Sequence, residues 1–564
     1  MSEIRTKIDE SAKQLTGEGS PWETTRDSID GIEYTLYKNA PQSLKELIDA
    51  GRAHGDNEFL IYEGERLTFN QFFAKVDALS YQLVNEFGLK TGDHVAIAMR
   101  NYPEWMISFA AVALAGGIVV PINSWGQRAE LEYALMDSDS KIAFFDQQRF
   151  DFIADDLESL GVTAIVARPS KGNTNAQNIE SVISAAGDNT LAEHKTLAGE
   201  DSAMIMYTSG TTGNPKGALS SHRNIGQAIF NFEMMAICAA MSDPEPIGKM
   251  LERGHPPKVL LSVPLFHVSG CHSVFLLSLR AGRPIVIMHK WDKIQALEYI
   301  ENERVTMISA VPTMLMDMLD ADEWDNYDTS SMFGFGAGGS AQPPRLSSKI
   351  YEKLPDSFPG TGYGMTESNA TGFAATGAAY KYQPKSTGVV TPIVDIKIID
   401  DNGNEVAQGE AGQILIKSPT NVKGYWKKPD ATAETLIDGW LYTGDVGYMN
   451  DEGFLFITDR IKDMVIRGGE NIYSAEVESA ILTHEGIAEA AVFGVPDEHL
   501  GEELAAAVVL RDESLNVDAI QTHVASQLAK FKVPTKVFIQ SEELPKNATR
   551  KILKKPLKEK YANS

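Results

Sequence analysis

The eleven residues from Tyr207 to Gly217 carry the densest set of groups that could bind an anion. Their sequence, YTSGTTGNPKG, holds three glycines, four aliphatic hydroxyls and one lysine, directly after the apolar run 203–206. A strand that ends in such a segment leads into a mobile loop of backbone N–H and hydroxyl donors, which suit polyphosphate oxygens. Glycine also lets the backbone approach the anion closely. We therefore expect a polyphosphate-binding loop here.

This loop does not fit the Walker pattern of P-loop proteins. That pattern has four residues between its glycines and Ser or Thr after its lysine. Here two residues separate Gly210 from Gly213, and Gly217 follows Lys216. A polar surface turn is the alternative, but few ordinary turns alternate Thr, Ser and Gly so densely.

A second candidate site is the run 362–368, with the sequence GYGMTES. The Tyr363 ring can stack on a base, and the Glu367 carboxylate together with Thr366 can hold Mg²⁺ through hard oxygen ligands. A surface turn is again the alternative interpretation. The motif therefore suits a nucleotide site with a metal ion.

The glycine-rich run 334–340, GFGAGGS, formally satisfies the dinucleotide-binding fingerprint. That interpretation is disfavoured because Pro343 and Pro344 follow and no clear ribose-binding acid lies on a later strand.

Three further segments hold charged residues whose types suit phosphate and ribose chemistry. Asp445 ends the run WLYTGD, Arg460 and Lys462 lie in the run 459–471, and Lys551 lies in the run 545–553. Each has an ordinary interpretation, because an Asp after a strand is often a turn residue and a basic C-terminal tail is often solvated. His267, in PLFHVSG, is a lone histidine of the kind that is more often structural.

Together and in this order, the motifs resemble those of the adenylate-forming enzymes, which include acyl-CoA synthetases, luciferases and the adenylation domains of peptide synthetases. The resemblance extends from about residue 50 to about residue 560. The chain is similar to an AMP-forming acyl-CoA synthetase. Such an enzyme joins a carboxylic acid to coenzyme A through an acyl-AMP intermediate, with ATP and Mg²⁺.

The resemblance implies a role for each matching residue. ATP-binding residues are expected at Thr208, Ser209, Gly210, Thr211, Thr212, Lys216, Gly338, Tyr363, Gly364, Thr366, Asp445, Arg460 and Lys551. Substrate-binding residues are expected at His267, Gly336, Ala337 and Gly338. Catalytic roles fall on Lys551, Glu367, Thr366 and His267, and Mg²⁺ ligands on Glu367 and Thr211. Coenzyme A is expected to pass Gly468 and Gly469, and Lys462 is the implied hinge.

In the family, the residue matching Asp445 accepts hydrogen bonds from both ribose hydroxyls, and the one matching Arg460 assists it. The residue matching Lys551 bridges the substrate carboxylate and the phosphates. His267 corresponds to a mobile gate or pocket wall, and we do not expect it to act as a general base. The family usually has Gly immediately before its essential lysine, whereas this chain has Arg550.

The elements that must position these residues alternate between helix and strand. Helices are expected from about residue 67 and over 105–114, and strands over 93–99, 141–145, 258–263, 283–288 and 306–311. Such alternation predicts an α/β fold with parallel-rich sheets covered by helices. Residues 1–40 are polar and are expected to form a loosely packed lead-in.

The pattern changes to β-rich hairpins after about residue 385, with turns at 401–404 and 450–453. A compact α+β pattern returns from residue 475, with helices over 476–484 and 517–530 and strands over 490–495 and 505–510. We therefore expect a large N-terminal domain over residues 1–460, its β-rich subdomain at about 385–460, and a small mobile C-terminal domain over 461–564.

The composition limits the partners. A net charge of −26 disfavours nucleic acid and anionic membrane surfaces as main partners. Two cysteines, Cys238 and Cys271, exclude a disulfide framework and indicate a reducing interior. The N-terminus has no apolar signal core, and no run of 18 apolar residues occurs. We expect a cytoplasmic protein without an integral membrane segment, and the resemblance adds a possible homodimer.

The expected acid is apolar. The candidate pocket segments 267–271, 310–312 and 336–338 hold small and apolar residues and no acid to bind an α-amino group. A medium- or long-chain fatty acid fits best, and an aryl or cinnamate-type acid is the closest alternative. Two alternatives of other classes stay open: a luciferase-like oxygenase, and a non-catalytic nucleotide-binding protein if Arg550 disables the lysine loop.

Overall fold

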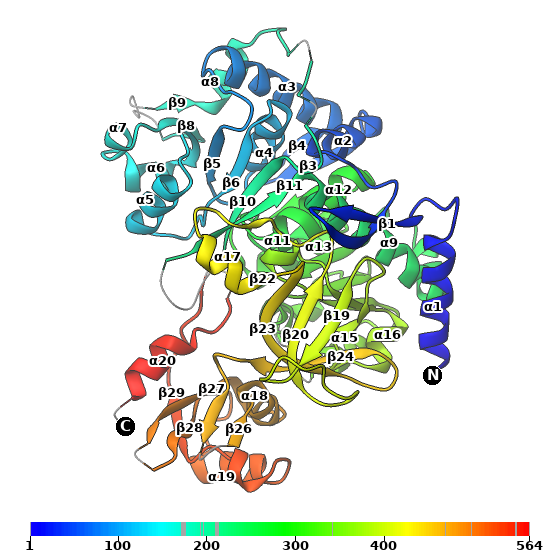
Figure 1. The fold of residues 1–564 in the computed structure, drawn as a ribbon, viewed down its shortest axis with the longest axis vertical. Coiled ribbons are helices and arrows are strands. Elements are labelled where there is room, and N and C mark those ends of the chain that lie inside the picture. Colours follow the sequence, from blue (N-terminus) through cyan, green and yellow to red (C-terminus); the bar gives the residue numbers. More distant parts are fainter. Residues whose placement is uncertain are drawn as a thin grey trace.

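The structure is a computed structural model. It describes residues 2–170, 176–191, 193–195, 197–208, 214–340, 342–343, 345–467, 470–497, 499–547 and 550–562. These residues form three large sheets and a separate two-stranded hairpin (Figure 1).

An eight-stranded sheet forms one layer of the large N-terminal part, and its central strands run parallel. Parallel neighbours require crossover connections, which place helices on the faces of the sheet. Across the sheet the strands are β21 (Gly424–Tyr425), β11 (Lys216–Ser221), β10 (Ser202–Thr208), β6 (Ile118–Pro121), β5 (His94–Ala98), β7 (Ile142–Asp146), β8 (Thr163–Ala167) and β9 (Gln177–Asn178). The helices of this region are α3 (Phe69–Asn85), α4 (Pro103–Leu114), α5 (Arg128–Asp137), α6 (Gln147–Ile153), α7 (Leu157–Leu160), α8 (Ile179–Ala185), α9 (His222–Ser242) and α10 (Pro244–Glu252).

The fourteen-stranded sheet is parallel from β3 to β16 and antiparallel from β16 to β19. Its strands are β4 (Glu65–Thr68), β3 (Glu58–Tyr62), β13 (Ile285–Ile287), β12 (Val259–Leu261), β14 (Met307–Ala310), β15 (Gly334–Ala337), β16 (Phe358–Tyr363), β17 (Phe373–Thr376), β18 (Gly388–Val390), β24 (Phe454–Arg460), β23 (Trp440–Met449), β20 (Gly412–Lys417), β19 (Asp395–Ile399) and β22 (Leu436–Ile437). The helices nearby in sequence are α11 (Val268–Gly270), η2 (Cys271–Leu276), α12 (Leu277–Ala281), α13 (Lys293–Glu303), α14 (Pro312–Leu319), η3 (Trp324–Asn326), α15 (Leu346–Lys353), η4 (Thr366–Ser368), α16 (Ala378–Tyr382) and α17 (Pro429–Thr435). The antiparallel half begins with β17, slightly before the predicted change at 385.

The C-terminal residues build a sheet of their own, drawn at the bottom of Figure 1. Its strands are β26 (Glu470–Ile472), β25 (Val465–Arg467), β28 (Gly501–Leu510), β27 (Ile487–Asp497) and β29 (Lys536–Gln540). The helices are α18 (Ser474–Leu482), α19 (Val517–Ala525), η5 (Lys530–Lys532) and α20 (Lys554–Tyr561). The helix predicted to reach Lys530 thus ends at Ala525. Sheet membership changes between Arg460 and Val465, which supports a domain division near residue 461.

Residues 2–40 form a helix and a hairpin, and the prediction of a loosely packed lead-in is wrong. They form α1 (Glu3–Thr16), β1 (Thr24–Ile29) and β2 (Ile32–Tyr37), followed by α2 (Leu44–Asp49) and η1 (Ala50–His54). Ile8 and Leu15 of α1 are buried in one cluster with Phe230 of α9. The apolar stripe of α1 is short and lies among charged residues, so the overall polarity of the segment concealed it.

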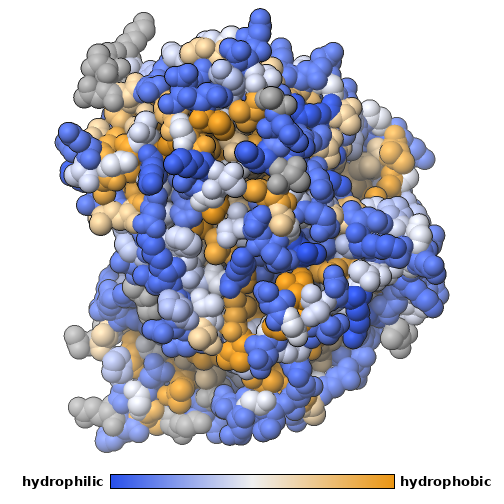
Figure 2. All heavy atoms as spheres, turned by 45° about the horizontal axis from the view of Figure 1, so that its top comes forward, coloured by the Kyte–Doolittle hydropathy of each residue, from blue (hydrophilic) through white to orange (hydrophobic). Residues whose placement is uncertain are grey.

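The core is formed by the helices and strands that sequence periodicity indicates best. Every residue of α4 is buried, which explains why its sequence is apolar except for Glu104 and Ser108. Among the described residues, one helix, α9, is long and apolar enough to cross a membrane, and 56% of its most apolar window is buried within the protein. Hydrophilic residues cover most of the face in Figure 2, with smaller apolar areas among them.

Candidate active site

The predicted anion loop joins two antiparallel strands, β10 and β11, with Thr208 opposite Lys216. The Thr208 hydroxyl donates to the Lys216 carbonyl oxygen at 3.4 Å. A Cβ atom at Gly217 would lie 2.6 Å from the side chain of Ile205, so glycine is required where the second strand begins. The other predicted phosphate contacts lie outside the described residues: Ser209, Gly210, Thr211 and Thr212.

Glu367 is buried in the short helix η4, and its carboxylate accepts a 2.7 Å hydrogen bond from the Tyr425 hydroxyl. The ammonium of Lys216 lies 4.9 Å from the centre of the Tyr425 ring. Burial and the Glu367 charge raise the pKa of Tyr425, so the phenol stays a proton donor. Tyr425 therefore links the strand after the anion loop to the candidate metal ligand. Thr366 is the first residue of the same helix and is partly exposed.

Asp445, Tyr363 and Arg460 form one group. The Tyr363 hydroxyl donates to Asp445 Oδ2 at 2.6 Å, and Arg460 Nε lies 2.9 Å from Asp445 Oδ1. Asp445 and Arg460 occupy paired positions of β23 and β24, and the Asp445 side chain is only 4% exposed. Burial and then the Asp445 carboxylate raise the pKa of Tyr363 well above its usual value. The arrangement presents a buried, partly neutralised carboxylate that can accept hydrogen bonds.

The predicted small residues line the ends of adjacent parallel strands. Gly336 and Ala337 are the last residues of β15, which pairs with β14 and β16, and Gly338 follows them. Gly336 is exposed, and the nearest atoms to a Cβ there would lie 3.6 Å away or more, so space exists beside it. A Cβ at Gly364 would lie 2.4 Å from the backbone of Ala370, so that glycine is needed for close backbone packing.

His267 caps the start of a helix that runs through α11, η2 and α12, of which η2 is a π-helical segment. Its ring contacts Phe266, with centroids 4.4 Å apart. Burial lowers the pKa of His267 to about 4, so the imidazole is neutral at pH 7. A Cβ at Gly270 would lie 2.3 Å from the Pro264 carbonyl oxygen, which shows how tightly this turn is packed. A neutral, half-buried ring suits a pocket wall.

Lys551 of the C-terminal part reaches the same group of residues. Burial and the nearby Arg460 guanidinium lower the pKa of Lys551 to about 8, and the charges of Asp445 and Lys462 also act on it. The Lys551 backbone N–H donates to Asn547 Oδ1 at 2.9 Å. The charges of Asp445 and Arg460, on β23 and β24, therefore act on the predicted lysine of the C-terminal part.

The predicted hinge lies in a tight turn between the two sheets. The Arg460 carbonyl oxygen accepts hydrogen bonds from the N–H groups of Asp463, at 2.9 Å, and Met464, at 3.0 Å. Lys462 is in the middle of this turn, and burial and Arg460 lower its pKa. Gly468 and Gly469, the predicted coenzyme A contacts, lie outside the described residues.

Arg550 adopts the left-handed backbone conformation, with φ of 60°, for which glycine is better suited. The Arg550 guanidinium lies 3.3 Å from the Glu543 carboxylate. The Arg550 backbone N–H donates to the Asn547 carbonyl oxygen at 2.9 Å. The Arg550 backbone thus takes the shape that a glycine would allow.

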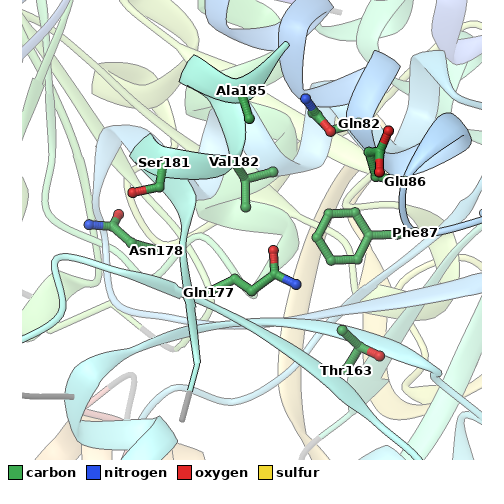
Figure 3. Close-up of a pocket in the computed structure, with 9 residues that line it drawn as sticks. All are labelled: Gln82, Glu86, Phe87, Thr163, Gln177, Asn178, Ser181, Val182 and Ala185. Atoms are coloured by element: carbon green, nitrogen blue, oxygen red, sulfur yellow. The ribbon is translucent and has the colours of Figure 1, made fainter. Parts of the chain in front are cut away.

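The described residues line two clefts of interest. One, of about 470 Å³, lies between the two domains and is lined mainly by polar and basic residues, including Arg100, His289, Lys290, Lys546 and Arg550. The other, of about 630 Å³, is lined by α3, β8, β9 and α8 and by none of the predicted residues (Figure 3). The inter-domain cleft adjoins the lysine loop and gives a charged ligand access to it.

Sequence reasoning missed Tyr425 and the buried polar residues Asp459 and Ser474, which contact one another near the hinge. Tyr425 stands in KGYW, an unremarkable sequence whose only signal is two adjacent aromatic residues. Asp459 does belong to a charged motif, DRIKD, but its partner fifteen residues later cannot be read from that motif.

Comparisons with known proteins agree with this arrangement. The AMP-binding enzyme family model matches residues 48–426, and the model of the AMP-binding enzyme C-terminal domain matches residues 476–551. A long-chain-fatty-acid–CoA ligase of Bacillus subtilis is 34% identical, over 96% of this chain and 98% of its own. A feruloyl-CoA synthase of Amycolatopsis is 31% identical, over 88% of this chain and 94% of its own. The structure of o-succinylbenzoate CoA synthetase from Bacillus subtilis with its acyl-adenylate has a TM-score of 0.75 at 30% identity, covering 91% and 97% of the two chains.

The chain belongs to the family of AMP-binding enzymes. The predicted family and the predicted α/β fold, with a large N-terminal part and a small C-terminal domain, are thereby confirmed. One relative is named as a long-chain-fatty-acid–CoA ligase and the other as a feruloyl-CoA synthase, in agreement with the predicted enzyme class, and ATP and coenzyme A are fitting substrates for the family.

Proposed function

We propose that this protein ligates a carboxylic acid to coenzyme A in two steps. The carboxylate first attacks the α-phosphate of ATP, which forms acyl-AMP and releases pyrophosphate. The thiolate sulfur of coenzyme A then attacks the acyl carbon, and AMP leaves with the electrons of the broken acyl–oxygen bond. The observation that carries this proposal is the buried Asp445 carboxylate, held by Arg460 at 2.9 Å and by the Tyr363 hydroxyl at 2.6 Å, and the charges of Asp445 and Arg460 also act on Lys551 of the C-terminal domain.

The first step brings an anionic nucleophile to a polyanion, so it depends on positioning and charge neutralisation. Lys551, with a pKa of about 8, is mostly charged at pH 7 and can neutralise the developing charge at the α-phosphate. Thr208 and Lys216 would contact the outer phosphates from the ends of β10 and β11. Losing one preorganised donor of this kind typically costs about 10²- to 10³-fold in rate.

The nucleoside would lie over the strand ends that carry the small residues. Asp445 would accept hydrogen bonds from the ribose hydroxyls, with Arg460 holding the carboxylate in place. The Tyr363 ring would lie against the adenine, since its hydroxyl already points to the same carboxylate. Gly336 and Gly338 leave room for the base and for the carboxyl end of the acid.

Glu367 is the described residue best suited to hold Mg²⁺. No group of three or more His, Cys, Asp or Glu side chains that could hold a metal occurs among the described residues. A single carboxylate fits magnesium, which usually binds one or two protein carboxylates together with substrate phosphates and water. The ion would supply further neutralisation of phosphate charge. Thr211, the other proposed ligand, lies outside the described residues.

The second step would use a different domain arrangement. We propose that the C-terminal domain rotates about the turn that holds Lys462, so that Lys551 leaves and the segment with Gly468 and Gly469 enters. The basic inter-domain cleft offers the anionic end of coenzyme A a path towards this region. Lys551 and Lys462 therefore serve separate steps.

The acid is proposed to be a medium- or long-chain fatty acid. The name of the 34% identical relative favours a long chain, and a pocket wall with a neutral His267 fits an apolar acid. Each buried methylene contributes about 0.8 kcal/mol, so pocket depth would set the preferred length. An aryl acid is the second candidate, because the feruloyl-CoA synthase matches almost as well.

Acid-dependent ATP–pyrophosphate exchange across fatty acids of increasing length and a set of aromatic acids tests this proposal. We expect exchange to rise with chain length, and thioester to appear once coenzyme A is added. Exchange only with aromatic acids would replace the fatty acid by the second candidate. No exchange with any acid would contradict the proposed function.

We also propose that the protein works in the cytoplasm, given its acidic surface and its two reduced cysteines, Cys238 and Cys271, both buried. A homodimer is proposed from the resemblance to the family. Light scattering of the purified protein at several concentrations would show its mass in solution, and a monomer at all of them would contradict the dimer.

A further inference from the structure

A buried polar network joins three elements next to the hinge. The Lys554 ammonium lies 2.8 Å from Glu478 Oε1 and donates to Ser474 Oγ at 2.5 Å. The Ser474 hydroxyl in turn donates to Asp459 Oδ1 at 3.0 Å, and the Ser474 N–H donates to Asp459 Oδ2. Asp459 is 5% exposed and Ser474 is fully buried. The four side chains thus form one continuous chain of contacts.

This network crosses the boundary between the two sheets. Asp459 is paired with Val446 inside the fourteen-stranded sheet. Ser474 and Glu478 lie on α18, and Lys554 begins α20, both on the C-terminal side of the hinge turn. Figure 1 shows α18 lying beneath the end of β24, as their contacts also indicate. Rotation of the C-terminal domain would therefore change the Ser474–Asp459 contact.

Because its carboxylates and ammonium are charged and buried, the network is stable only when all of them are present. It holds two carboxylates and one ammonium, and burial raises the pKa of both Asp459 and Glu478. Although burial opposes the charge of Lys554, Glu478 and Asp459 raise its pKa, so it stays protonated. Removing one partner of such a group leaves an uncompensated buried charge.

Lys554 is only three residues after Lys551. The contacts of Lys554 with Glu478 and Ser474 therefore limit where Lys551 can lie. The Leu553 N–H donates to the Pro545 carbonyl oxygen at 2.7 Å, and this hydrogen bond joins the two ends of the segment that holds Lys551. Glu478 also accepts the Val492 N–H at 2.8 Å, which ties the anchor to β27. The chain three residues after Lys551 is thus tied to the C-terminal core through Lys554.

We propose that Lys554 is a positioning residue that holds Lys551 against the Asp445–Arg460 pair, and that the Ser474–Asp459 contact makes this placement specific to the present domain arrangement. The network acts as a clasp that favours the first step over the second. This inference rests on the proposed function for its kinetic part, whereas its structural part is independent of any activity.

Two substitutions test the clasp, Lys554→Met and Ser474→Ala, with Lys555→Met as the matched control because Lys555 is the next residue and 62% exposed. Two half-reactions are measured: ATP–pyrophosphate exchange, and thioester formation from supplied acyl-AMP. We expect Lys554→Met to lower exchange about 10- to 100-fold and to leave thioester formation almost unchanged, since displacing a catalytic group by an ångström has this effect. Ser474→Ala, which removes both hydrogen bonds of the Ser474 hydroxyl, should lower exchange by about 2- to 10-fold.

A positioning role also predicts a change in pH dependence. The alkaline loss of exchange should move from near pH 8 towards the ordinary lysine range in Lys554→Met, because Lys551 would no longer be held beside Arg460. Lys554→Arg, which keeps the charge and the reach, should restore most of the exchange. Equal losses in both half-reactions, an unshifted alkaline limb, or an equal effect of Lys555→Met would each overturn the proposal.

The rate of trypsin cleavage at the hinge, after Arg460 or Lys462, tests the structural part of the proposal without an enzyme assay. If the network clasps the domains, cleavage of the folded protein should be several times faster in Lys554→Met and Ser474→Ala than in Lys555→Met. Unchanged cleavage in both would overturn the clasp. If the unsubstituted protein shows no acid-dependent exchange, the proposed function fails, and the cleavage rates alone still decide the structural part.

Discussion

The Tyr363 hydroxyl donates a 2.6 Å hydrogen bond to the Asp445 carboxylate, the group proposed to bind the ribose. Under this proposal, the same side chain would supply a ring for the base and a donor that competes with the ribose hydroxyls for one carboxylate oxygen. Arg460 takes the other oxygen at 2.9 Å. Nucleotide binding must thus exchange a tyrosine hydroxyl for a sugar hydroxyl, which makes the roles of ring and hydroxyl separable.

We predict that Tyr363→Phe keeps the KM for ATP within about threefold of its original value, because one neutral hydrogen bond is exchanged for another. Tyr363→Ala, which removes the ring, should raise this KM by about tenfold, in line with a lost stacking contact. Asp445→Asn should raise it by about 10- to 100-fold, since bonds to a charged acceptor are the stronger ones. Initial rates over a range of ATP concentrations give all three values. A Tyr363→Phe effect as large as that of Tyr363→Ala would contradict the separation.

The rate of adenylation should fall as the pH rises through about 8. Burial and Arg460 lower the pKa of Lys551 to this value, so the ammonium is present below it and lost above it. Exchange measured from pH 6 to 10 at saturating ATP should show the loss. Lys551→Arg provides the control, because arginine stays charged throughout this range. Its residual exchange should be flat where that of the original protein declines.

The two lysines should affect different half-reactions. Lys551→Ala should lower ATP–pyrophosphate exchange by about 10²- to 10³-fold, the usual effect of losing a preorganised charge, and should spare thioester formation from supplied acyl-AMP. Lys462→Pro should do the reverse, because proline restricts the φ angle of the turn that must move. If both variants lost both half-reactions to the same degree, rotation of the domain would not separate the steps.

Arg550 allows a stability prediction that involves no substrate. Arg550→Gly relieves the left-handed backbone strain, whereas Arg550→Ala keeps the strain and loses the same ion pair with Glu543. Removing the strain stabilises the glycine variant by about 1–2 kcal/mol. The greater conformational entropy of its unfolded chain destabilises it by about 0.4–1 kcal/mol. We expect the glycine variant to be more stable than the alanine variant by about 0.5–1 kcal/mol in urea unfolding. An alanine variant at least as stable as the glycine variant would show that the turn adapts.

How far the sequence predicted the site depended on how local each signal is. The strand and helix patterns that lead to β10, β16 and Gly336 are local, and so are the runs that hold Glu367 and Lys551. The contact of Tyr425 with Glu367 joins residues 58 positions apart and depends on how β21 lies beside β11, which no local pattern encodes. The Arg550 side chain itself does not indicate a backbone shape typical of glycine, and the glycine that the family usually has at this position is the one signal for it.

The Tyr425–Glu367 contact leads to a prediction about magnesium. Because Glu367 is buried and one of its oxygens already accepts the Tyr425 hydroxyl, the carboxylate is held in a fixed orientation. Partners that orient a metal ligand typically change metal affinity by about 10- to 100-fold, so Tyr425→Phe should raise the half-saturating Mg²⁺ concentration for exchange by about tenfold. Glu367→Gln, which removes the charge itself, should raise it further.

Tyr448→Phe, on β23, is the control because that ring stacks on Phe456 at 5.1 Å and should not affect Mg²⁺. The phenylalanine at 425 keeps a ring beside Lys216, so a change in Mg²⁺ dependence would come from the lost hydroxyl. If Tyr425→Phe and Tyr448→Phe have the same half-saturating Mg²⁺ concentration, the Tyr425 hydroxyl does not orient Glu367 for metal binding.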